Sequence, residues 1–198
     1  RDSASNTSDN LTVSSFTIAG SKPVLAEVTA IGTTSDSTPS YTFSSTKSGT
    51  ITYGGSCSSD NTTASTSNNT ITFGSGDNMS DGTYSNCTIQ VTGNDNVSSD
   101  NLSVSSFTID ATKPSLAEVT AIGTTGDSTP SYTFSSTEAG TVIYNGSCSS
   151  DNLTTASAGN NTFVFDNMSD GTYSNCVIRV RDSASNTSDN LTVSSFTI

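Results

Sequence analysis

Carboxylates are the side chains of this sequence best suited to site chemistry, because they are preferred ligands of hard cations such as Ca²⁺. The second half of the chain carries four candidates in expected loops: Asp110, Asp127, Glu138 and Asp182. The equivalent positions of the first half hold Ala19, Asp36, Lys47 and Gly93. Three acids are therefore missing together, and one is replaced by a positive charge, as a single shared site predicts. The alternative is that these are solvated turn acids, with Lys47 forming a surface pair with Asp36.

The four cysteines stand at matched positions of the two halves and suggest two disulfides. These are Cys57–Cys87 and Cys148–Cys176. Closing a loop of about 30 residues stabilises a module by roughly 3–3.5 kcal/mol in the chain-entropy model, and it indicates an oxidising compartment. Free buried thiols in a cytosolic protein are the alternative. Metal binding by cysteine is disfavoured, because the sequence has no histidine and no close cysteine pair.

Enzymatic chemistry has little support in the sequence. Ser56 and Ser147 follow glycines, but no histidine is available to act as their base. A paired-carboxylate glycosidase would need a cleft, which small repeated sandwiches do not offer. We therefore expect no enzyme.

Charge and hydropathy exclude further classes. The net charge is −12 with six basic residues, which argues against binding to nucleic-acid phosphates or to an anionic membrane surface. No apolar run approaches the length of a transmembrane helix, and no signal peptide is recognisable.

The chain is built from repeats. Residues 1–18 are identical to residues 181–198, and Pro23, Tyr41 and Cys57 recur 91 positions later as Pro114, Tyr132 and Cys148. A repeat of this period indicates an array of similar modules. We divide the chain into residues 1–18, the last strand of a preceding repeat, a first repeat at 19–109 and a second at 110–198.

Strand signals recur every 8 to 15 residues between clusters of Gly, Asn, Asp and Ser, and no segment has helical periodicity. In the second repeat we expect strands at 116–122, 131–135, 140–144, 161–165, 172–180 and 191–198. About seven strands in each repeat predict tandem immunoglobulin-like Greek-key β-sandwiches, all-β, with one disulfide each.

The segment around Tyr84 suggests a tyrosine corner, because an Asp-Gly turn, a tyrosine and a cysteine follow one another. Tyr84 has the opposite alternation from Cys87, Ile89 and Val91, so we expect a bulge after it that resets the register. The tyrosine lies three residues before the cysteine instead of two. There is no Trp to pack on the disulfide, so this is not an antibody-type domain.

Several motifs together resemble the bacterial immunoglobulin-like repeats of large surface adhesins and biofilm proteins. They are STPSYTFSSTEAGT, the DGTY turn, RDSASN and FTID-x-x-x-P, and they cover both repeats. The resemblance implies long stalks, often stiffened by calcium between domains, that hold a distal adhesive domain away from the cell. It places the calcium ligands at positions similar to the four acids named above, together at one end of a sandwich.

These observations favour a structural stalk or fibre segment of an extracellular or cell-surface protein. Its partners would be neighbouring repeats, with self-assembly into a filament left open, and calcium is its only expected cofactor. The short linkers AGSKP and DATKP end in proline and favour a semi-rigid rod. Residues 1–18 could also donate a strand to another subunit. The alternative function is a glycan- or protein-binding immunoglobulin-like module.

Asn-x-Ser/Thr sequons are abundant in the chain. They include Asn10, Asn61, Asn78, Asn101, Asn152 and Asn167. Many arise from composition alone, and they become glycan acceptors only where the machinery exists.

Overall fold

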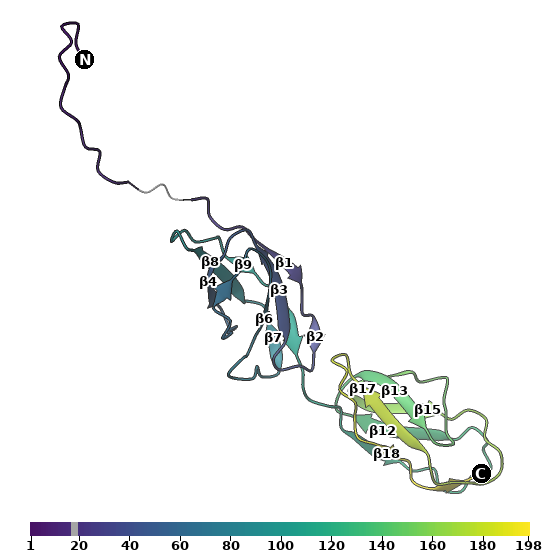
Figure 1. The fold of residues 1–198 in the computed structure, drawn as a ribbon. Helices are drawn as coiled ribbons and strands as arrows, with labels where there is room; N and C mark the ends of the chain where they lie inside the picture. The colour runs from purple at the N-terminus through teal and green to yellow at the C-terminus, as the bar shows by residue number, and fades with distance from the viewer. Residues whose placement is uncertain (17–19) are drawn as a thin grey trace.

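The computed structural model describes residues 1–16 and 20–198, and regular structure in them consists of β-strands alone (Figure 1). The first module contains β1 (Leu25–Thr29), β2 (Thr33–Thr34), β3 (Ser40–Ser45), β4 (Gly49–Gly54), β5 (Thr63–Ala64), β6 (Ser67–Thr72), β7 (Gly82–Tyr84), β8 (Thr88–Gly93), β9 (Leu102–Ser103) and β10 (Phe107–Ile109). The second contains β11 (Leu116–Thr120), β12 (Ser131–Ser136), β13 (Gly140–Asn145), β14 (Thr155–Ala156), β15 (Gly159–Val164), β16 (Thr172–Tyr173), β17 (Val177–Arg181), β18 (Leu191–Thr192) and β19 (Phe196–Thr197). Across the described residues, no helix is long and apolar enough to cross a membrane.

Each module is a two-layer sandwich. In the first, the sheet β1-β3-β6 packs against the sheet β5-β4-β8-β9, and β10 lies between β7 and the parallel strand β2. The second module repeats this arrangement with β11-β12-β15 and β14-β13-β17-β18. The chain changes sheet between β3 and β4 and again between β5 and β6, as in a Greek key. The predicted immunoglobulin-like sandwich with one disulfide per module is confirmed.

Alternation along the strands produces the core. In β12, Tyr132, Phe134 and Ser136 are buried while the residues between them face outward, because successive side chains of a strand point to opposite faces. In β17 of the other sheet, Ile178 and Val180 point into the core in the same alternating way. Each module has its own buried cluster of this kind.

The tyrosine corner forms as expected. The Tyr84 hydroxyl donates to the Ser80 carbonyl at 2.9 Å, and its ring stacks on Phe107 at 5.3 Å. The chain leaves the ladder between β7 and β8, so that Cys87 enters the core with the opposite alternation. The register is therefore reset, but by a three-residue interruption instead of a single bulge.

Residues 1–16 extend away from the first module (Figure 1). Val13 and Phe16 are 71% and 77% exposed, whereas their counterparts Val193 and Phe196 in the identical segment are 1% and 2% exposed. The expected last strand at 1–18 includes Thr17 and Ile18, which lie outside the described residues. The described part of it forms no strand here, because no second layer covers its apolar side chains.

Candidate metal centre at the module junction

The segment that connects the two modules is held by hydrogen bonds from both of them. The Asp81 carboxylate, in the Asp-Gly turn before β7, accepts from the Ala111 amide at 2.8 Å and from the Thr112 hydroxyl at 2.6 Å. The Thr112 and Ala111 bonds lower the pKa of Asp81, since they favour its charged form. From the second module, Asn186 Nδ2 donates to the Asp110 carbonyl at 2.6 Å.

Asp182 lies at the end of β17 in a tight turn that its own carboxylate closes. One oxygen accepts from the Asn186 amide and the other from Asn186 Nδ2, both at 2.9 Å. Asp2 and Asn6 of the free tail form the same turn with the same bonds. The Asp-Ser-Ala-Ser-Asn sequence therefore determines this turn locally, before any module packs around it.

Three of the four predicted acids meet at this junction. Carboxylate oxygens of Asp110, Glu138 and Asp182 all lie within 4.8 Å of one another, with Asp182 buried and the other two half-buried. They come from the end of β10, the turn between β12 and β13, and the end of β17. Burial and the negative charges of Asp110, Asp182 and Asp81 raise the pKa of Glu138.

The fourth predicted acid is not part of the group. Asp127 lies near the other end of the module, where its carboxylate accepts from the Thr129 amide and hydroxyl at 2.9 and 3.1 Å. The neighbouring Thr125 amide donates to the Thr197 carbonyl of β19. Asp127 closes a turn there, so its expected place beside Asp110, Glu138 and Asp182 is wrong.

The acid that the sequence analysis missed is Asp81. Its charge reaches Glu138 from the preceding module, and its hydrogen bonds hold the linker. The Asp-Gly-Thr-Tyr motif was the available signal, but within one module it indicates only a turn. The role of Asp81 in holding the linker exists only where two modules meet.

The first module has a lysine where the second has Glu138. Lys47 Nζ lies 3.0 Å from Asp95 Oδ2, and this pair holds the pKa of Asp95 low. Gly20 lies close to this pair, so that a Cβ there would meet the Asp95 carboxylate. The expected Lys47–Asp36 pair is wrong, because Asp36 instead accepts from the Thr38 amide and hydroxyl. Ala19 lies outside the described residues.

The four cysteines form the two expected disulfides, Cys57–Cys87 and Cys148–Cys176, within their own modules. Each joins the segment after the third long strand to the start of the strand that follows the tyrosine corner. Disulfides are typical of proteins of oxidising compartments.

A second, half-buried carboxylate connects the first strand of each module to the segment before its last strand. Glu118 on β11 accepts from the Ser194 amide at 2.9 Å, the Ser194 hydroxyl at 2.7 Å and the Tyr132 hydroxyl at 3.0 Å. Glu27 makes the same bonds with Ser105 and Tyr41. We call each set the strand latch.

Comparison with known proteins finds distant similarity among solved structures. No family model matches the sequence, and no curated protein matches it. Among solved structures, the fibronectin(III)-like modules of Clostridium thermocellum CbhA are similar, with a TM-score of 0.44 and 10% sequence identity. The match covers 88% of this chain and 94% of that chain.

The junction group has the donor atoms that a hard cation prefers. Three carboxylates supply negatively charged oxygen ligands from three loops, which suits the flexible coordination of Ca²⁺ better than the strict octahedron of Mg²⁺. Cysteine is absent from the group, and the sequence has no histidine, so the donor set does not suit zinc.

Proposed function

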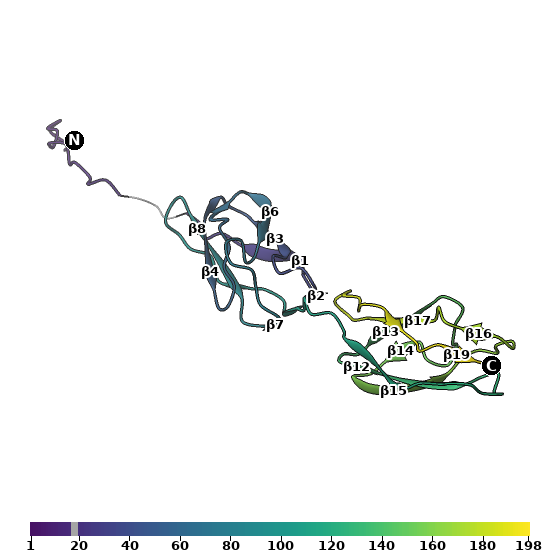
Figure 2. The ribbon, with the colours of Figure 1, turned by 90° about the horizontal axis from the view of Figure 1, so that it is seen from below.

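We propose that the chain is a segment of an extracellular structural stalk or fibre, in which modules follow one another end to end. The observation that carries the proposal is the clamped linker, because Asp81 and Asn186 fix residues 110–112 from the two sides. Figure 2 shows the modules following one another along the chain, as Figure 1 does. In a flexible tether the backbone amides and carbonyls would form hydrogen bonds to water. In this linker the Ala111 amide and the Asp110 carbonyl form them to side chains of the two modules.

Resistance to pulling fits the contacts at the two ends of each module. A force applied along the array acts on the first and last strands, and these are joined by the strand latch and by the ion pair of Lys113 with Asp189 at 2.7 Å. Behind them, the disulfide prevents extension of the 28-residue loop from Cys148 to Cys176. That loop would otherwise add about 90–100 Å of chain length.

Calcium at the junction is part of the same proposal. Asp110, Glu138 and Asp182 would hold the ion, which would supply positive charge where burial and the neighbouring acids disfavour the charged form of Glu138. The first module supports this assignment, because a lysine ammonium supplies positive charge at the position of Glu138. Calcium in the second module and the Lys47 ammonium in the first would then each balance the negative charge of the neighbouring acids at equivalent positions.

The free tail suggests the partner of residues 1–18. Leu11, Val13 and Phe16 are exposed, whereas the identical residues of the second module pack in its core. A module of this same type is therefore the partner that fits the tail, either as the preceding repeat or in another subunit of a filament.

Small-angle scattering of residues 1–198, oxidised, in calcium and then in excess chelator tests the proposal. An extended pair that bends only in chelator supports both the stalk and the ion. An extended pair unaffected by chelator contradicts the calcium site, and the hydrogen bonds of Asp81 and Asn186 to the linker then account for the shape. A compact, side-by-side pair contradicts the stalk and favours the alternative, a glycan- or protein-binding module.

A further inference from the structure

Sequons are more frequent in this chain than its composition produces. Of eight asparagines in residues 110–198, six are followed by x-Ser/Thr. A Ser/Thr content of well over a third would produce roughly three by chance. A sequon can accept a glycan in the folded protein only where its asparagine amide is exposed and makes no hydrogen bond.

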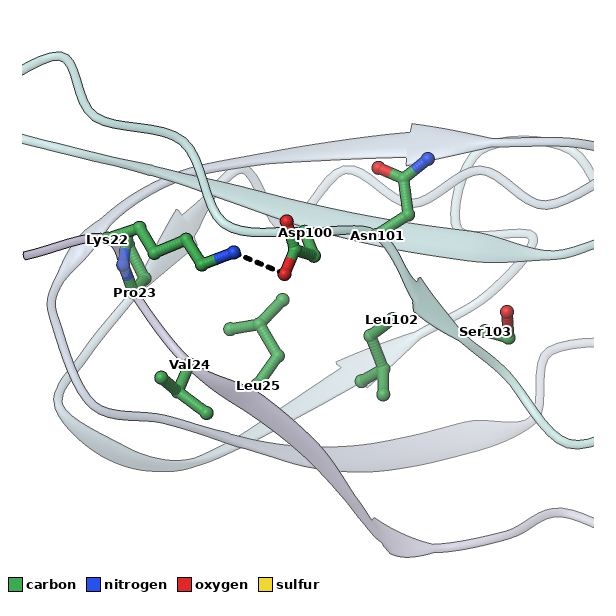
Figure 3. A pocket seen from close by; sticks show the side chains of 8 residues that line it. All are labelled: Lys22, Pro23, Val24, Leu25, Asp100, Asn101, Leu102 and Ser103. Carbon is green, nitrogen blue, oxygen red and sulfur yellow. Dashed lines mark hydrogen bonds and ion pairs between the residues drawn. The ribbon is translucent and has the colours of Figure 1, made fainter.

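The fold treats the Asn186 sequon differently from those of Asn101 and Asn190. The Asn186 amide is half-buried and donates to both the Asp110 carbonyl and Asp182 Oδ2. Asn101 and Asn190, at equivalent positions, are exposed, and within the described part of the chain no hydrogen bond engages their side chains. Figure 3 shows the Asn101 amide pointing away from the Lys22–Asp100 pair and from Leu102.

The rest of each triplet is arranged to leave the site accessible. Leu102 and Leu191 pack against the core, while the hydroxyl residues Ser103 and Thr192 face outward. The amide and hydroxyl that an acceptor needs are therefore presented, and the middle residue anchors them.

Both asparagines stand immediately before an edge strand. β9 and β18 are the terminal strands of their four-stranded sheets. An exposed edge is a template for pairing with another chain, and natural proteins cover such edges. A bulky polar group at Asn101 or Asn190 would cover this edge in every module of an array.

We propose that Asn101 and Asn190 are acceptor sites for N-linked glycans. The donor is a lipid-pyrophosphate-linked oligosaccharide. A bond forms between Asn Nδ2 and the anomeric carbon, the bond from that carbon to the phosphate oxygen breaks, the amide loses one proton, and the lipid pyrophosphate leaves with the bonding electron pair. Asn186 is not an acceptor in the folded protein, because its amide hydrogens are already donated at the junction.

The test uses the folded, disulfide-bonded chain with an oligosaccharyltransferase and a lipid-linked oligosaccharide. Site occupancy is mapped by mass spectrometry after enzymatic deglycosylation in heavy-oxygen water. The tail provides an internal control, since Asn10 begins the same Asn-Leu-Thr triplet as Asn190 without a folded module around it. We expect modification at Asn10, Asn101 and Asn190, none at Asn186, and loss of one site each in Ser103→Ala and Thr192→Ala.

Three results would overturn the proposal. If Asn10 is modified and neither Asn101 nor Asn190 is, the fold does not present them. If Asn10 is also unmodified, the triplet itself is not an acceptor. Modification of Asn186 as complete as that of Asn101 would show that the fold does not select among sequons.

Discussion

Lys47 and Glu138 occupy the same position in the two modules and carry opposite charges. Lys47 pairs with Asp95 at 3.0 Å, whereas Glu138 faces Asp110 and Asp182, with carboxylate oxygens of the three within 4.8 Å. Asp95 has no acidic counterpart in the second module, where Ala184 stands. The modules thus place charge differently at the end where each receives the preceding segment.

This difference predicts that the proposed calcium site can be replaced by an internal ion pair. In the double variant Glu138→Lys/Ala184→Asp, we expect calcium binding to be lost, because one ligand is removed and an ammonium takes its place. Titration calorimetry measures the binding, and scattering in chelator measures the shape. Asp127→Asn is the matched control and should bind calcium normally; loss of binding there would contradict the three-acid site.

Removing the clamp should loosen the junction without unfolding either module. Asp81→Ala deletes the acceptor of the Ala111 and Thr112 bonds, so we expect larger inter-module motion by NMR relaxation and residual dipolar couplings. Asp170→Ala changes the equivalent turn, after which no linker follows in these 198 residues, and should leave the motion unchanged. Equal effects of both variants would show that the turn, not the clamp, matters.

The strand latch should make the second module sensitive to acid. Burial raises the pKa of Glu118, but the bonds from Ser194 and Tyr132 outweigh it and hold the pKa below its usual value. A carboxylate with a depressed folded pKa contributes stability above its unfolded pKa, and this is lost as the pH falls through the folded pKa. Glu118→Gln should therefore flatten the dependence of the second module's unfolding free energy on pH below about 4.5. Urea titrations at several pH values measure it, with the unchanged Glu27 latch as the internal reference.

The disulfide should contribute a large part of a module's stability. Cys148→Ala/Cys176→Ala should lower the free energy of unfolding of the second module by roughly 3–3.5 kcal/mol. Under force, its unfolding should release about 90–100 Å more chain than the oxidised module does. An unchanged extension in a single-molecule pulling experiment would contradict the mechanical role.

The tail should complete a module from which the identical segment has been removed. A chain of residues 19–180 lacks β18 and β19, so its second module should be unfolded, and a peptide of residues 1–18 should restore its NMR spectrum. The same peptide with Val13→Asp should fail, because the equivalent Val193 is 1% exposed in the core. Folding of residues 19–180 without any peptide would show that the last strands are dispensable.

Much of the local architecture could be predicted from the sequence, because short-range patterns control it. The alternation in SYTFSS places Tyr132 and Phe134 in the core, and the Asp-Gly-Thr-Tyr motif produces the tyrosine corner. The expected strand at 172–180 is instead two strands, β16 and β17. The strands β2, β5 and β14 escaped prediction, since two residues carry no periodicity.

The sequence by itself determined the repeat, the β-sandwich class, the cysteine pairs and the turn closed by Asp182. Each depends on neighbours in the chain or on identical spacing in two copies. The tertiary structure alone decided that Asp127 lies away from Asp110, that Lys47 pairs with Asp95, and that Asp81 clamps the next module's linker. The Lys47 and Asp81 contacts join residues 30 to 48 positions apart. Which loops meet there depends on how the sheets stack and where one module ends against the next.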